Sequence, residues 1–523
     1  MIRTKLILIF LFFYSLLLAE GNQQALLKQQ TIESVKHFDI NRITMAVQNS
    51  GVFANDPETR HCGFWYDDVS LIWISGLWLA ARVDGEVRAS ASDYFADFIG
   101  SAIDKQGNSF GKDDSTFRVF KISTGDNEFN NPDYAGWQVE LGAPVDKNGK
   151  PWIIVDQTLW CSFTDAYEKE RKYNPCPPLN AEIHLTTWGS KTLDNVVFMR
   201  WEFFNKGDKL WQNAYAGVFV DADICDASNN LVGSDSTLSM VYTFEHTGHQ
   251  QFDSTFAVGY VVLEAPKIES IGDTALTFYG HLLDYKNANV ISPLVYKHMP
   301  YDWAPPPHGE NYAKYWIYRR LAGQDTAGSL MINPITGKCT KWGLSGDPIT
   351  KNGWIDELPQ DRFMMISTGP FDVAPGDTNA MTIAIIAVTD SNYSGTVPAL
   401  KERAGEIRTY FRESLHIITD VNYSCSENDH ISDFQLFQNY PNPFNSSTQI
   451  SYCLKEGGKI ELTVFNINGQ KVKTLYNGFK EAGTHKITWD GTNDAGNLIS
   501  SGLFFYQLRQ KNKIITKKML YLK

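Results

Sequence analysis

The segments Ile450-Ser-Tyr-Cys-Leu454 and Lys459-Ile-Glu-Leu-Thr-Val464 show the pattern that decides the fold of the C-terminal part of this chain. Apolar residues alternate with polar ones, which is the period of a strand with one buried face. Asn468-Gly469 then supplies a tight-turn signal, and further strand-like segments follow it. About seven short strands in residues 434–523 predict a small immunoglobulin-like sandwich.

Strand signals also extend back to about residue 40. The apolar and aromatic run Ile72–Val83 is followed by the turn dipeptide Asp84-Gly85, which predicts a hairpin. Residues 396–415 differ, because apolar residues recur there every three or four positions and predict a helix, with Thr396 as its N-cap and Pro398 in its first turn. The sequence therefore predicts a mainly β protein: a β-sandwich-type ectodomain with one helix near 396–415, followed by the C-terminal immunoglobulin-like seven-strand sandwich.

The sequence predicts that the chain is divided into five segments: a signal peptide, an N-terminal arm, an ectodomain, a linker and a terminal domain. Residues 1–21 have a basic start, an apolar run too short to span a bilayer and small residues at the end, which is typical of a secretory signal peptide. Residues 22–39 are expected to be an N-terminal arm, 40–415 the ectodomain, as one domain or two subdomains, 416–433 a polar linker and 434–523 the terminal domain. No later segment is apolar enough to span a membrane, so we expect no transmembrane span after signal removal.

The composition narrows the classes of partner. The formal net charge is −12, which argues against a nucleic-acid partner because such a partner requires a basic face. Aromatic residues make up 13% of the chain and charged residues only 20%, which fits a large extracellular β protein with well-filled cores.

The cysteines predict one disulfide. The chain has 7 Cys, so at least one is unpaired, and export would permit disulfide formation. Cys161 and Cys176 flank a polar stretch and are the most plausible pair. No CxxC spacing occurs, so a structural zinc site is not expected.

An acidic loop is the strongest candidate for a metal site. Carboxylates recur in Asp221-Ala-Asp223-Ile-Cys-Asp226, with Asp235 further on, and such hard oxygen ligands suit a structural calcium ion. The loop is not an EF-hand, because Asp226 stands where that loop needs glycine. The other interpretation is an acidic loop capped by Asx turns.

The terminal segment closely resembles the type A C-terminal sorting domain of the bacterial type IX (Por) secretion system. The matching stretches, in order, are Gln438-Asn-Tyr-Pro-Asn-Pro-Phe-Asn445, Val464-Phe-Asn-Ile-Asn-Gly-Gln-Lys-Val472, Ala482-Gly483, Ile487-Thr-Trp-Asp-Gly491, Ser501-Gly-Leu-Phe-Phe-Tyr506 and Lys517-Lys-Met-Leu520. The residues to which the resemblance assigns sorting are Asn439, Tyr440, Pro441, Asn442, Pro443, Phe444, Asn445, Lys517 and Lys518. One departure is Ser446, where the family commonly has proline.

This resemblance implies where the protein goes. It implies a Gram-negative source, export to the periplasm, and passage across the outer membrane by the type IX machinery, to the outer cell surface or the medium. More loosely, residues 40–415 are similar to ectodomains of secreted proteins that carry the same sorting domain. That looser resemblance supports a β architecture and transfers no catalytic residues.

The function of the ectodomain stays open between two classes. No nucleophile elbow, phosphate-binding loop or dinucleotide fingerprint occurs in the sequence. We therefore expect a binding or structural surface module whose partners are glycans or other surface proteins. The alternative is an extracellular hydrolase that acts on polysaccharide or protein, for which no catalytic residue can be chosen among 59 acidic side chains.

Overall fold

The computed structural model describes residues 35–57, 61–172, 174–248, 254–293, 309–415, 434–436, 439, 444, 447–467, 469–511 and 513–521. The predicted signal peptide and linker lie outside these residues. The chain forms two compact units, Met1–Leu415 and His416–Lys523, each of which is described by itself. The fold is mainly β, as predicted, and no helix among the described residues is long and apolar enough to cross a membrane.

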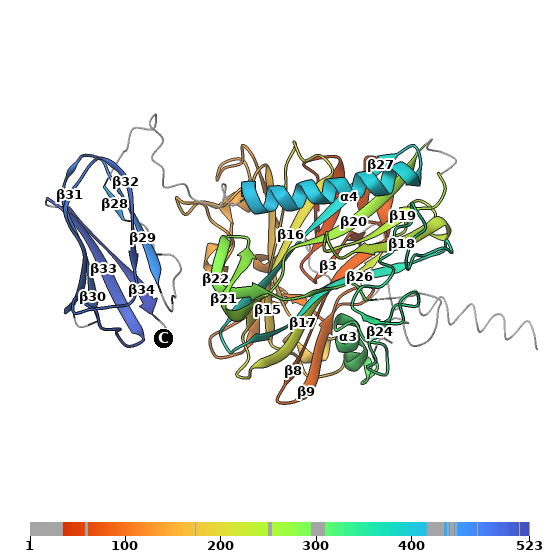
Figure 1. Cartoon of the computed structure of the whole chain (residues 1–523), viewed down its shortest axis with the longest axis horizontal. Coiled ribbons are helices and arrows are strands. Elements are labelled where there is room, and N and C mark those ends of the chain that lie inside the picture. The colour runs from red at the N-terminus through yellow and green to blue at the C-terminus, as the bar shows by residue number, and fades with distance from the viewer. Residues whose placement is uncertain are drawn as a thin grey trace, which may run out of the picture. The chain divides into compact units, whose positions relative to one another are not determined.

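Two large antiparallel sheets form the first unit, the ectodomain (Figure 1). Sheet A has ten strands: β1 Val35–Phe38, β2 Ile43–Gln48, β3 Val52–Phe53, β6 Phe64–Tyr66, β7 Val69–Ile72, β8 Ile74–Val83, β9 Glu86–Ala91, β17 Trp211–Asp221, β23 Val290–Ile291 and β26 Phe363–Val373. Sheet D has nine: β10 Ile99–Gly100, β13 Phe120–Ser123, β14 Gln157–Thr164, β15 Ala181–Gly189, β16 Val196–Asn205, β18 Asn230–Asp235, β19 Met240–Glu245, β20 Thr255–Glu264 and β27 Thr378–Asp390.

Four two-stranded hairpins, three α-helices and several single-turn helices make up the rest of the regular structure in the described ectodomain. The hairpins are β4 Asn55–Asp56 with β5 His61–Cys62, β11 Ala102–Ile103 with β12 Ser109–Phe110, β21 Lys267–Thr277 with β22 Gly280–Asn287, and β24 Met331–Ile332 with β25 Cys339–Thr340. The helices are α2 Pro132–Ala135, α3 Ala313–Leu321 and α4 Tyr393–Tyr410. The end of the predicted N-terminal arm is a strand, because β1 pairs with β2.

The largest hydrophobic core lies between the two sheets and takes side chains from both of them. A second core lies on the other face of sheet D, where α4 packs with Leu400, Ala404 and Ile407. A third lies on the other face of sheet A, beneath α3. Central strands such as β8 are therefore covered on both faces, which explains why the run from Ile74 to Val83 is apolar almost without interruption.

The hairpin and helix predictions are confirmed, with one correction at the helix start. Asp84 and Gly85 both have positive φ and join β8 to β9, as the turn dipeptide predicts. The N-cap of α4 is Asn392 and not Thr396; the Asn392 side chain accepts a hydrogen bond from the Gly395 amide. The Thr396 hydroxyl instead bonds the Asn392 carbonyl one turn back, inside the helix.

The second unit is the predicted seven-strand immunoglobulin-like sandwich. Its three-stranded sheet contains β28 Gln435–Leu436, β29 Thr448–Leu454 and β32 Gly483–Trp489; its four-stranded sheet contains β30 Gly458–Asn466, β31 Lys471–Lys480, β33 Gly502–Gln510 and β34 Lys513–Tyr521. Ile450, Tyr452, Ile460, Leu462 and Val464 are buried in one core, as their alternation predicts.

Candidate functional site

Three carboxylates meet at the ends of β17 and β26. Asp221 closes β17, Asp223 follows it, and Asp361 precedes β26. Asp221 pairs with Phe363 across the antiparallel ladder, so the register brings Asp361 beside the other two. One oxygen from each lies within 4.8 Å of the others. We call these residues the carboxylate group.

The carboxylate group fits a hard cation. Calcium–oxygen distances of about 2.3–2.6 Å would allow one ion to contact all three side chains. The Tyr94 hydroxyl donates a hydrogen bond to Asp221, and burial, together with the charges of Asp221 and Asp223, raises the pKa of Tyr94. The site therefore has a neutral donor beside its anions.

The structure brings together two of the four predicted ligands, Asp221 and Asp223. Asp226 caps the short turn after it, accepting a hydrogen bond from the Ser228 amide at 3.0 Å. Asp235 forms an ion pair with Lys401 of α4 at 3.1 Å. Neither belongs to the carboxylate group, whereas Asp361 does. Asp361 is not among the ligands predicted from the sequence, because it approaches Asp221 and Asp223 only through the pairing of β17 with β26, which lie far apart in the sequence.

The predicted disulfide between Cys161 and Cys176 is not formed. Both residues are buried free thiols. Cys161 lies in β14, within the core between the sheets. Cys176 lies beside Arg171 and the Ala89 carbonyl, at 3.8 and 3.5 Å. The polar stretch between the cysteines therefore carries Cys176 to β9 instead of returning it to Cys161.

Four of the predicted sorting residues lie in the described part of the second unit. The Asn439 amide donates to the Tyr506 hydroxyl at 2.7 Å. Phe444 packs on Trp489 and Tyr521 in the core, with ring centroids 5.4 and 4.9 Å away. Lys517 and Lys518 lie on β34, opposite Tyr506 and Phe505. Tyr440, Pro441, Asn442, Pro443 and Asn445 lie outside the described residues.

A second charged group, which the sequence did not reveal, lies on the face of sheet D that points away from the main core. We call it the sheet-face cluster; its members are Glu182, His184, Arg200, Glu202, Phe204, Lys206 and Glu264. In the β15–β16 ladder Glu182 lies opposite Phe204, and His184 opposite Glu202. The residues between them, such as Ile183 and Trp201, point into the core.

Close polar contacts and ion pairs join the polar members of the sheet-face cluster. His184 Nε2 lies 3.1 Å from Glu182 Oε1, which is also 3.2 Å from Lys206 Nζ. Arg200 pairs with Glu202 at 2.9 Å and with Glu264 at 3.1 Å. The signal that could have found the cluster is the recurrence of charged residues at alternate positions of otherwise apolar strands.

These contacts lower the pKa values of two carboxyls in the cluster, those of Glu202 and Glu182. Burial alone would raise the pKa of Glu202, but the Arg200 charge outweighs it and the pKa falls below its usual value. The pKa of Glu182 falls for the same reason, because hydrogen bonds from His184 and the Ile103 amide outweigh burial. Both groups are held as carboxylates, which suits hydrogen-bond acceptance and opposes proton donation.

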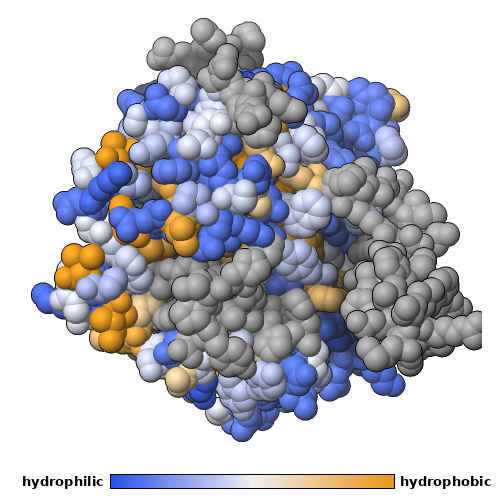
Figure 2. Space-filling view, turned by 90° about the vertical axis from the view of Figure 1, so that its right-hand side faces the viewer, coloured by the Kyte–Doolittle hydropathy of each residue, from blue (hydrophilic) through white to orange (hydrophobic). Residues whose placement is uncertain are grey.

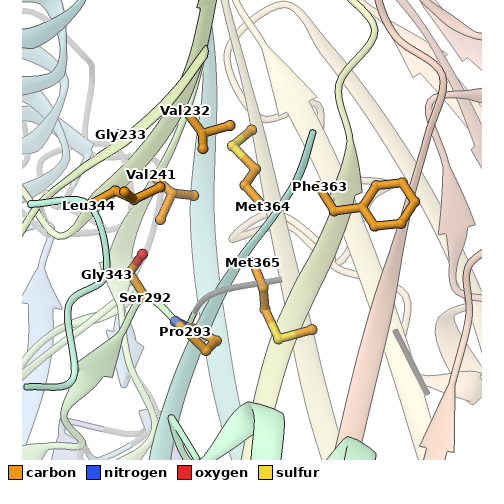
Figure 3. A pocket seen from close by; sticks show the side chains of 10 residues that line it. All are labelled: Val232, Gly233, Val241, Ser292, Pro293, Gly343, Leu344, Phe363, Met364 and Met365. Atoms are coloured by element: carbon orange, nitrogen blue, oxygen red, sulfur yellow. The ribbon is translucent and has the colours of Figure 1, made fainter. Parts of the chain in front are cut away.

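A small pocket opens near β18, β19 and β26 (Figure 3). Its volume is about 300 Å³, including space open to solvent, and Val232, Val241 and Leu344 line one side. The Met364 and Met365 thioethers point in different directions, as neighbours on a strand do (Figure 3). None of the lining residues is titratable, and apart from Ser292 and backbone groups the lining is apolar.

Comparison with known proteins identifies part of the second unit. The FlgD Ig-like domain family matches residues 446–513. No curated protein matches the chain. Among solved structures, FlgD from P. aeruginosa is 21% identical over 14% of this chain and 57% of its own, with a TM-score of 0.12.

Two larger structures give weaker likenesses. A polysaccharide lyase is 8% identical over 86% of this chain and 47% of its own, with a TM-score of 0.19. Dimeric latent PorU from Porphyromonas gingivalis is 9% identical over 93% of this chain and 32% of its own, with a TM-score of 0.17. The chain thus spans about half the length of the first structures it matches. TM-scores this low establish no shared architecture for the ectodomain.

Proposed function

We propose that this protein is exported by the type IX secretion pathway and acts outside the cell as a binding or structural module. The observation that carries the export proposal is the separate terminal sandwich, whose core is built around Phe444 of the resemblance motif. In the proposed mechanism the signal peptide is removed and the ectodomain folds. The secretion machinery then recognises residues 434–523 for passage across the outer membrane of a Gram-negative cell.

The ectodomain supports the binding role through its construction. Two extended sheets share one core and are further covered by α3 and α4, which makes a rigid platform. The coloured part of the face in Figure 2 is mostly hydrophilic, with hydrophobic groups in separate patches mainly on its left side, which suits contact with polar partners in water. Glycans and neighbouring surface proteins are the proposed partners. The alternative function is a hydrolase that acts on polysaccharide or protein. Measured turnover of such a polymer would favour the hydrolase.

We also propose a structural calcium ion at Asp221, Asp223 and Asp361. The support is the convergence of three carboxylates from segments far apart in the sequence. An ion there would tie the end of β17 to the start of β26 and screen the repulsion between the carboxylates.

Deletion of residues 434–523 tests the export proposal. In a type IX-competent host we expect the truncated chain to accumulate in the periplasm while the full chain reaches the surface or medium, as measured by fractionation and protease accessibility. Phe444→Ala should reduce export by weakening the core of the sorting unit. Phe479→Ala, at a 62% exposed site in the same unit, is the matched control. Normal export of the truncated chain would refute the proposal.

A further inference from the structure

We propose that the sheet-face cluster, together with Tyr279, is a binding surface for neutral polysaccharide. This inference rests on the proposed binding function of the ectodomain and names its ligand class and site. Tyr279 lies at the tip of the β21–β22 hairpin, and Arg200 Cζ is 5.1 Å from its ring centroid. The same guanidinium pairs with Glu202, so the Tyr279 ring and the Glu202 carboxylate flank one buried cation.

The surface continues across the strands from Glu202 to Phe204 and Lys206. The His184 ring, opposite Glu202, lies 4.5 Å from the Phe204 ring between centroids. Lys206 Nζ lies 5.4 Å from the Phe204 centroid. Aromatic faces thus alternate with an acceptor carboxylate and a donor ammonium along one strip of the sheet.

The exposed part of this strip has the chemistry that a sugar ring needs. Tyr279 is 47% exposed, and the side chains of Lys206 and Glu202 are 33% and 23% exposed. Rings of this kind present flat apolar faces to the C–H groups of a pyranose. Glu202 can accept hydrogen bonds from hydroxyl groups, and Lys206 can donate to them.

The buried part of the strip holds those groups in place. Arg200 is 6% exposed and is fixed by Glu202 and Glu264, while the Thr382 hydroxyl donates to Glu264 at 2.5 Å. Gly142, with φ of +93°, covers His184 so closely that a Cβ there would lie 2.8 Å from its Cε1 atom. Groups fixed before a ligand arrives lose little conformational entropy on binding.

The charge balance selects a neutral ligand. The carboxylates of Glu182, Glu202 and Glu264 each pair with a cationic or histidine side chain. No excess of positive charge is therefore available for a polyanion within the cluster, and the chain carries a formal net charge of −12. Hydroxyl groups, which both donate and accept, match such paired charges best.

Affinity electrophoresis of the full chain in gels containing xylan, glucomannan, mannan or soluble β-glucan tests the inference, with alginate as the polyanion. We expect retardation by at least one neutral polymer and none by alginate. Tyr279→Ala and Glu202→Gln should each weaken that retardation by about tenfold. The matched control is Tyr312→Ala, because Tyr312 is 45% exposed and lies beside α3. Circular dichroism verifies that each variant is folded.

Three outcomes would overturn the inference. They are binding of alginate alone, retardation by none of the polymers, and equal losses in the Tyr279 variant and the control. In the last case the ectodomain would still bind glycan, but elsewhere, so the proposed function would stand. Export is measured separately, and its failure would affect only the sorting proposal.

Discussion

At the scale of single residues, burial and pairing give the acidic side chains of the ectodomain opposite pH responses. Burial raises the pKa of both Glu182 and Glu202, but the Arg200 charge beside Glu202, and the hydrogen bonds that Glu182 accepts from His184 and the Ile103 amide, outweigh burial and lower both pKa values. Glu245 at the end of β19 is fully buried, and its Oε2 accepts the Phe256 amide at 2.8 Å. Burial raises the pKa of Glu245 to about 7, although the Phe256 amide partly opposes it.

Glu245 should make the ectodomain less stable as pH rises. Its pKa in the folded state lies above the ordinary value of 4.5, so the folded state favours the protonated form. The stability from this group is fully present below pH 4.5 and is lost as pH rises through about 7. We expect Glu245→Gln to remove this loss, on the order of 1–3 kcal/mol at pH 8, measured by denaturant unfolding of the full chain at pH 5 and pH 8.

The matched control is Glu413→Gln, because Glu413 is exposed and its pairing with Arg412 is a surface ion pair. The Glu413→Gln substitution should leave the pH dependence of the free energy of unfolding unchanged. If the stability of the Glu245→Gln variant changed between pH 5 and pH 8 as much as that of the parent chain, the Glu245 carboxyl would not titrate between these pH values.

At the scale of elements, strand pairing decides which acidic residues are neighbours. The antiparallel register of β17 and β26 places Asp361 beside Asp221 and Asp223. Asp226 caps a turn instead, although it is closer to Asp221 in the sequence.

The calcium proposal follows from this register and can be tested by one pair of substitutions. We expect calcium to raise the melting temperature of the ectodomain transition by about 2–5 °C over the protein in EDTA. Asp361→Asn should abolish this difference, whereas Asp226→Asn should retain it. The measurement is differential scanning calorimetry of the full chain. A response that depends on Asp226 and not on Asp361 would contradict the site assigned here.

At the scale of the whole molecule, the chain has two compact units with separate hydrophobic cores. The terminal unit has one core of its own, in which Trp489 is 1% exposed and contacts Phe444 and Phe504. Under the proposed export route, delivery and extracellular function would belong to different units of the chain.

Two cores should give two unfolding transitions. Trp489→Ala removes a large buried side chain and should destabilise the terminal unit by about 3–5 kcal/mol. In calorimetry of the full chain we expect the transition of the terminal unit to move to lower temperature. The melting temperature of the ectodomain transition should not change. Phe479→Ala, on the surface of the same unit, should move neither by more than about 1–2 °C. A shift of both transitions in Trp489→Ala would show that the units unfold together.

The sequence by itself determined the mainly β fold, the helix near residues 396–415 and the terminal sandwich. These depend on local signals: alternation at Ile450, Tyr452 and Leu454, the Asp84-Gly85 turn, and the helical spacing from Leu400 to Phe411. Each signal lies within one element, so it can be interpreted without knowing what packs against that element.

Only the tertiary structure decided which distant residues meet. It placed Asp361 with Asp221 and Asp223, separated Cys176 from Cys161, and gathered Glu182, Arg200, Glu202 and Glu264 on one face of sheet D. The physical reason is that strand register and sheet packing join segments more than a hundred residues apart, and nothing in the local period of either segment specifies its partner.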